Sequence, residues 1–153
     1  MLKYYSKMVV LQEVPGEISV SFAIAGCPHN CKNCSWANTI NKLPQKELTD
    51  EKFIDQLNKY KGLATCILFM GGNWEKEDLI KKLKMAKKYG FKTCLYTGDV
   101  LENVDNSILE NLSYVKVGPY VETLGGLDKP TTNQRFYDLI NKKTLNEEFR
   151  RVI

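Results

Sequence analysis

The sequence predicts an α/β protein with a mainly parallel sheet, and two observations carry this prediction. Short apolar runs, typical of buried strands, alternate along the chain with longer segments whose apolar residues recur at helical spacing. Such an alternation places successive strands side by side and parallel, joined by right-handed crossovers. With 153 residues, of which 43% are hydrophobic and 26% charged, the chain fits one soluble domain, residues 1–153, with a single core.

The predicted strands follow the apolar runs. Residues 4–11 indicate a short edge strand, and residues 18–25, rich in β-branched and apolar side chains, indicate a buried one. Further strands are predicted at residues 64–70, 91–97 and 113–117. The run of residues 64–70 is continuously apolar, as expected for a strand covered on both faces. Beyond Gly118 the alternation stops, and we expect a hairpin or a short strand and helix.

Two helices and a looser helical segment lie between these strands. The first helix is capped by Thr49 or Asp50 and ends before Gly62. The second spans residues 75–89, with its apolar side chains inward and its lysines in water. Residues 100–112 predict a less regular helical segment.

Three cysteines form the most specific motif of the chain. Cys27, Cys31 and Cys34 have C-x3-C-x2-C spacing directly after the strand of residues 18–25. Iron–sulfur clusters are usually held by four cysteines, so a triplet leaves one iron open for a substrate. A structural zinc site is the alternative, but zinc takes four ligands, and the next cysteine, Cys66, lies inside an apolar strand. We expect Cys66 and Cys94 to be buried structural thiols.

Composition limits the function classes. The net charge of +4 is small and the lysines are scattered, which argues against nucleic acid as a partner. No apolar run approaches the ~20 residues that span a membrane, and the first residues lack the pattern of a signal peptide. Five cysteines, three of them clustered, make a poor disulfide framework. We therefore expect a reduced, cytoplasmic protein.

The motif resembles that of the radical S-adenosylmethionine enzymes and, more narrowly, of the activating proteins of anaerobic ribonucleoside-triphosphate reductase. The resemblance runs from about Gln12 to Phe136. Its further motifs are Pro15-Gly16, Gly26, Met70-Gly71-Gly72-Asn73, Tyr96-Thr97-Gly98, Gly118-Pro119-Tyr120 and Thr132-Asn133-Gln134. Three positions depart from the pattern: Asn73 replaces an acidic residue, Asn33 an aromatic one, and Val117 an aspartate.

The resemblance implies a partial, open (β/α) barrel that binds a 4Fe-4S cluster and S-adenosyl-L-methionine. The cluster ligands would be Cys27, Cys31 and Cys34. The residues implied in cofactor binding are Gly71, Gly72, Asn73, Thr97, Gly98, Lys116 and Asn33, and those of the partner contact or pocket rim are Thr132, Asn133 and Gln134. Plainer interpretations stay open: a strand-to-helix turn at Gly71-Gly72, an exposed edge lysine at Lys116, and a turn at residues 132–134. If the glycine pair contacts the cofactor, a side chain at Gly72 is expected to block binding rather than folding.

The activity that the resemblance implies is the reductive cleavage of S-adenosylmethionine and the abstraction of a glycine Cα hydrogen. The implied partners are the large subunit of the anaerobic reductase, which would carry the glycyl radical, and an electron donor such as flavodoxin or ferredoxin. The alternatives are an activating enzyme of another glycyl-radical protein, of the pyruvate formate-lyase type, and a non-enzymatic iron–sulfur or zinc module.

Overall fold

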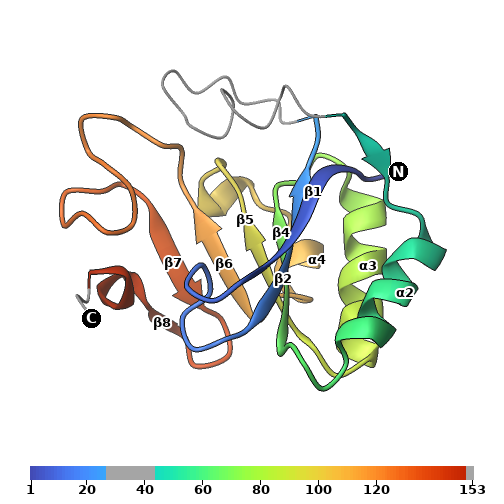
Figure 1. Ribbon diagram of the computed structural model, residues 1–153. Coiled ribbons are helices and arrows are strands. Elements are labelled where there is room, and N and C mark those ends of the chain that lie inside the picture. Colours follow the sequence, from blue (N-terminus) through green and yellow to red (C-terminus); the bar gives the residue numbers. More distant parts are fainter. Residues whose placement is uncertain (27–43, 151–153) are drawn as a thin grey trace.

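The computed structural model describes residues 1–26 and 44–150 (Figure 1). The strands are β1 (Lys3–Val10), β2 (Ser19–Ile24), β3 (Lys46–Glu47), β4 (Cys66–Met70), β5 (Lys92–Tyr96), β6 (Tyr114–Val117), β7 (Arg135–Asp138) and β8 (Lys143–Thr144). The helices are α2 (Asp50–Tyr60), α3 (Lys76–Lys88) and α4 (Asn106–Leu109), with short 3-10 helices η1 (Leu101–Asn103) and η2 (Asn146–Phe149). The eight strands of the described residues form one sheet in the order β3-β1-β2-β4-β5-β6-β7-β8.

The sheet is mixed, with a parallel centre. Strands β2, β4, β5 and β6 pair parallel with one another. The four outer pairings, β1 with β2 and β3, and β7 with β6 and β8, are antiparallel. The connections from β1 to β2 and from β7 to β8 are too short to hold a crossover helix, which parallel neighbours require. Within the described residues the sheet is open, with β3 and β8 at its edges, and the partial barrel stays a prediction.

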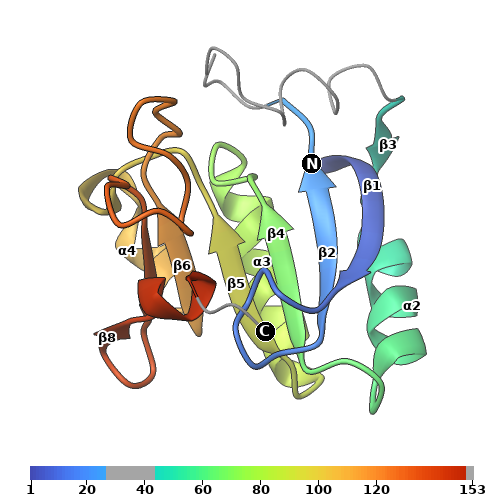
Figure 2. The same cartoon turned by 60° about the vertical axis from the view of Figure 1, so that its left-hand side comes forward.

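The helices cover one face of the sheet, and Figure 2 shows α3 and α4 behind the strands, with α2 at the right of the view. Alternation along β2 directs Phe22 into this layer, where its ring centroid lies 5.8 Å from that of Phe69 in β4 and 5.7 Å from that of Phe53 in α2. The other face carries a second core, to which Val14 before β2, Leu127 before β7 and Phe149 of η2 contribute.

Helix α3 departs from the prediction at one lysine. Leu79, Leu83 and Ala86 are buried against the sheet as expected, but Lys82 is also fully buried. Its Nζ donates to the carboxylates of Asp78, at 2.8 Å, and Asp50, at 3.2 Å. The expectation that every lysine of this helix faces water is therefore wrong, because two carboxylates compensate the buried charge.

The segments for which the sequence predicted little regular structure, residues 100–112 and the tail beyond Gly118, are indeed less regular. Residues 100–112 contain only η1 and the single turn of α4, and the tail beyond Gly118 contains the β7–β8 hairpin followed by η2. Strand β3 was not predicted. Its two residues are exposed and pair with Lys3 and Tyr4 of β1.

Candidate functional site

The ends of the four parallel strands bring the predicted motifs to one edge of the sheet. Figure 2 shows the arrowheads of β2, β4 and β5 at this edge. Gly26 lies just beyond β2, Gly71-Gly72 directly after β4, Thr97-Gly98 directly after β5 and Gly118 directly after β6. Ligands of parallel α/β sheets bind at this carboxyl edge. The predicted cofactor motifs are therefore neighbours in space, although the sequence separates them widely.

The backbone conformation and the close neighbours of positions 71 and 72, after β4, explain why both are glycine. Gly71 has a φ of +94°, and a Cβ there would lie 2.5 Å from Cη2 of Trp74. The indole Nε1 of Trp74 donates to the carbonyl of Ala25 at 3.3 Å, so the ring bridges the ends of β2 and β4. A Cβ on Gly72, where φ is +108°, would lie 3.2 Å from Cδ2 of Leu2 in the helix-side core. A side chain at either glycine would disturb the fold, which contradicts the expectation that a substitution of Gly72 blocks binding alone. The role of the pair in cofactor binding stays a prediction.

Asn73, Thr97 and Asp99 form a closed ring of hydrogen bonds between the ends of β4 and β5. Nδ2 of Asn73 donates to Oδ2 of Asp99 at 2.6 Å, and Oγ1 of Thr97 donates to Oδ1 of Asn73 at 3.1 Å. The backbone N–H of Asp99 donates to Oγ1 of Thr97 at 3.1 Å. The sequence predicted Asn73 and Thr97 as site residues and missed Asp99. An aspartate directly after the strand-end Thr97-Gly98 was the available signal.

Lys116 lies on the face of the sheet opposite the helices. Its neighbours Val115 and Val117 belong to the helix-side core, so alternation directs Lys116 to the other face. There its Nζ lies 5.6 Å from the centroid of the Tyr96 ring, within the range of a cation–π contact. The lysine is half-buried beside the last residue of β5, which is a different place from the exposed edge of the plainer interpretation. Its contact with the cofactor stays a prediction.

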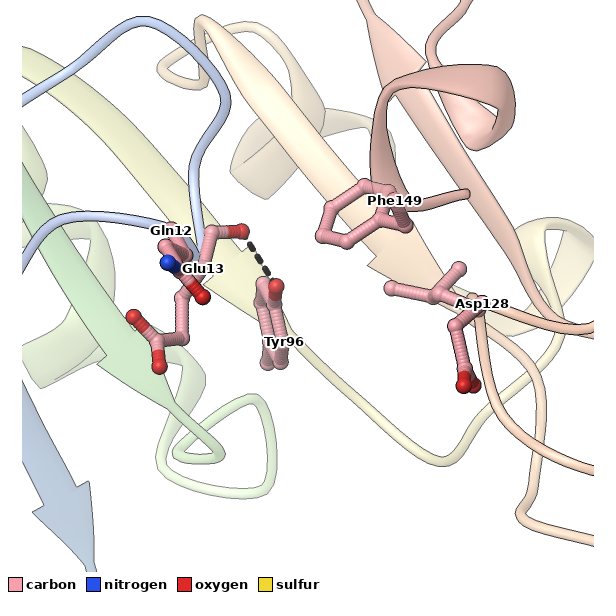
Figure 3. Close-up of a pocket in the computed structure, with 6 residues that line it drawn as sticks. Gln12, Glu13, Tyr96, Asp128 and Phe149 are labelled. Atoms are coloured by element: carbon pink, nitrogen blue, oxygen red, sulfur yellow. Dashed lines mark hydrogen bonds between the residues drawn. The ribbon is translucent and has the colours of Figure 1, made fainter. Parts of the chain in front are cut away.

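A pocket of about 270 Å³ opens on the same face, and Figure 3 shows it between the rings of Tyr96 and Phe149. Gln12, Glu13, Leu127 and Asp128 complete its lining. The hydroxyl of Tyr96 donates to the backbone carbonyl of Glu13, which ties the segment before β2 to the end of β5. Burial raises the pKa of Tyr96 well above its ordinary value of 10.0, so the phenol stays neutral and keeps this hydrogen bond.

The Thr132-Asn133-Gln134 element lies at the same edge and joins the end of β6 to the start of β7. Nε2 of Gln134 donates to the carbonyl of Gly118 at 3.3 Å, and Nδ2 of Asn133 donates to that of Pro119 at 3.1 Å. Oγ1 of Thr132 donates to the carbonyl of Gly125 at 2.9 Å. Thr132 and Gln134 are buried and only Asn133 is exposed. These contacts close the loop before β7, and a contact with a partner or cofactor stays a prediction.

Cys27, Cys31, Cys34 and Asn33 lie outside the described residues. In residues 1–26 and 44–150, no group of three or more histidine, cysteine or acidic side chains could hold a metal ion. The two described cysteines, Cys66 and Cys94, are free and buried on the sheet. Burial raises the pKa of the Cys66 thiol to about 12 and that of Cys94 well above 9.0, which disfavours the thiolate that a metal needs.

Comparison with known families identifies the chain. Residues 14–138, more than half of the chain, match the model of the 4Fe-4S single cluster domain family. The protein belongs to this family. The match includes Cys27, Cys31 and Cys34 together with the strand-end motifs, and it supports a 4Fe-4S cluster in place of structural zinc. The comparisons with curated proteins and with solved structures gave no match. None of the helices in the described part of the chain has the length and apolar character needed to cross a membrane.

Proposed function

We propose that the protein is a radical S-adenosylmethionine activase that generates the glycyl radical of the anaerobic ribonucleoside-triphosphate reductase. The observation that supports this most is the shared strand edge. In a chain of the 4Fe-4S single cluster family, the cysteine motif begins one residue after Gly26, and the ends of β4 and β5 at the same edge carry a compact polar group, Asn73, Thr97 and Asp99.

The donor types that the sequence supplies fit the two groups that the proposal requires. Three thiolates, from Cys27, Cys31 and Cys34, would hold the cluster and leave one iron for the amino and carboxylate groups of S-adenosylmethionine. When both are bound, the cluster would supply the electron for reductive cleavage of S-adenosylmethionine, and the cleaved cofactor would supply the oxidant that takes the glycine hydrogen. Lys116, on the face of the sheet opposite the helices, would bind the cofactor carboxylate.

The partner and the reductant follow from the resemblance. The large subunit of the anaerobic reductase would supply the acceptor glycine and close the site against water, and a flavodoxin or ferredoxin would supply the electron. For the isolated protein we therefore expect slow cleavage that is not coupled to glycyl-radical formation.

The test is cleavage by the anaerobically reconstituted protein. It should convert S-adenosylmethionine to 5′-deoxyadenosine slowly alone and faster with the large subunit, which should then show a glycyl radical by electron paramagnetic resonance. The signal should vanish when the acceptor glycine is changed to alanine. If the fully loaded protein does not cleave S-adenosylmethionine, the result favours a non-enzymatic iron–sulfur module. If a glycyl radical forms only on a protein of the pyruvate formate-lyase type, the protein is the other class of activase.

Cysteine variants test which thiols hold the cluster. Cys31→Ala should lose the iron of the wild-type protein, about four per chain for a thiolate-bound cubane. Cys94→Ala is the matched control, since this thiol is buried on the sheet, and it should keep the iron. If Cys66→Ala loses the cluster as completely as Cys31→Ala, the three-cysteine site is wrong.

A further inference from the structure

The outer side of β1 is only partly covered by a neighbouring strand. Strand β3 pairs with β1 at Lys3 and Tyr4 alone, whereas β1 continues to Val10. Towards β2, residues 6–10 pair in an unbroken register, because the bulge of β1 lies before Ser6. Among the described residues, no strand lies against the outer side of residues 6–10. The sheet therefore ends here in a regular strand whose outward backbone groups are available to a further strand.

We propose that this edge binds the same edge of a second copy of the chain, through antiparallel pairing of residues 6–10. The two-fold axis would stand perpendicular to the sheet at Met8. The residues opposite each other would be Met8 and Met8, Lys7 and Val9, and Ser6 and Val10. The added strand would stop at Ser6, before the part of β1 that β3 covers, so β3 would keep its place. The two sheets would become one continuous sheet.

The exposed side chains along this edge are apolar. Met8 is 59% exposed and Val9 is 47% exposed, and Leu11, directly after β1, is 66% exposed. An exposed, regular and apolar edge strand is a surface on which another strand pairs readily. Pairing with a second copy would cover these side chains with apolar neighbours from the opposite strand.

The lysine of this segment does not protect the edge. Lysines at sheet edges commonly prevent strand addition, because pairing would bury their charge. The Nζ of Lys7, however, donates to Oε1 of Gln56 at 2.6 Å and lies 5.2 Å from the centroid of the Tyr60 ring. Both contacts are with α2, so the charge of Lys7 is directed to the helix layer rather than across the edge.

Length and charge favour a second copy over a head-to-tail contact between the two ends of the sheet. The opposite edge strand, β8, has two residues, and one of them is Lys143. A contact of β1 with β8 would leave most of residues 6–10 unpaired. In the two-fold arrangement both strands have the same free length, and Lys7 faces Val9 instead of another lysine.

The arrangement leaves the candidate functional site accessible. A two-fold axis perpendicular to the sheet reverses the direction of every strand, so the carboxyl edges of the parallel strands would lie at opposite ends of the dimer. Each copy could then receive its own partner. The pairing requires neither the cluster nor S-adenosylmethionine, so it can fail while the proposed function holds, and the reverse is also true.

The experiment uses two charge variants at the axis. Because directly opposite side chains have their Cβ atoms about 5 Å apart, Met8→Lys and Met8→Glu each place like charges against one another. Sedimentation equilibrium of the full chain, reconstituted anaerobically, should show a dimer for the wild type and a monomer for each variant. An equal mixture of the two variants should form the dimer again, since lysine then faces glutamate. The side chain at position 8 is exposed, so both variants should fold, and circular dichroism checks this.

Leu63→Lys is the matched control. Leu63 is 69% exposed in the connection between α2 and β4, away from β1, and this variant should stay a dimer. A monomeric wild type overturns the proposal, as it would if another segment of the chain covered this edge in solution. A dimer that persists in Met8→Lys, a mixture that stays monomeric, or a monomeric Leu63→Lys overturns it as well.

Discussion

Replacing Gly71 by alanine should destabilise the fold through Trp74. A left-handed backbone costs a residue with a Cβ about 1–2 kcal/mol, and φ at Gly71 is +94°. The new Cβ would lie 2.5 Å from the indole, whose Nε1 is held by the Ala25 carbonyl. Overpacking of this kind costs a further 1–3 kcal/mol, so the free energy of unfolding should fall by about 2–5 kcal/mol. Urea unfolding of the reduced, cluster-free protein measures this change.

Gly90→Ala is the matched control. Its φ is +90°, and nothing lies within 4 Å of the position of its Cβ, so this variant carries the backbone cost alone. The difference between the two variants isolates the contact with Trp74, and Trp74→Ala should remove that difference in a double-mutant cycle. Equal destabilisation by Gly71→Ala and Gly90→Ala in the wild-type background would refute the close-contact argument.

Three further predictions concern buried polar groups. Burial opposes ionisation of Glu17 and by itself would raise its pKa. The hydrogen bonds to its carboxylate, above all the one from Lys92, outweigh burial and lower the pKa below the ordinary value of 4.5. Its stabilising contribution is complete above pH 4.5 and is lost as the pH falls through the lowered folded-state pKa, so the wild type should lose stability on acidification more steeply than Glu17→Gln. Cys66 should resist iodoacetamide at pH 8 in the folded protein and react after unfolding, because its thiol pKa is about 12; mass spectrometry of the labelled peptide checks this. Lys82→Met should lower the free energy of unfolding by about 1–3 kcal/mol, since it removes the buried ammonium that joins Asp50 and Asp78, whereas exposed Lys84→Met should change it by less than about 0.5 kcal/mol.

The sequence predicts the strands best where burial dominates. The apolar run of residues 64–70 contains β4, because a strand covered on both faces needs apolar side chains along its whole length, and β5 lies within the predicted residues 91–97. It says little about β3, whose two exposed residues join the sheet through backbone pairing alone. Backbone hydrogen bonds have no side-chain signature, so pairing at the sheet edges is not visible in the sequence.

Among the site residues, too, those with a local sequence signal could be predicted and those that depend on contacts between distant segments could not. Asn73 and Thr97 could be predicted because they belong to strand-end motifs that resemble those of the family, and the structure places them in contact. Asp99 and the bridge made by Trp74 could not, since both depend on which strand ends become neighbours. The buried Lys82 was missed for the same reason: one of its two carboxylate partners, Asp50, lies on another helix.

The strand order also has a consequence for synthesis. From β2 onward, the strands β4, β5, β6, β7 and β8 are each added at the growing edge of the sheet in the order in which the ribosome makes them. The helix-side core can therefore assemble while translation continues. The opposite face, with Leu68 and Tyr114, receives Phe136 and Phe149 only near the end. A nascent chain that stalls before β7 would expose this apolar face, and chaperones that recognise such surfaces should bind it there.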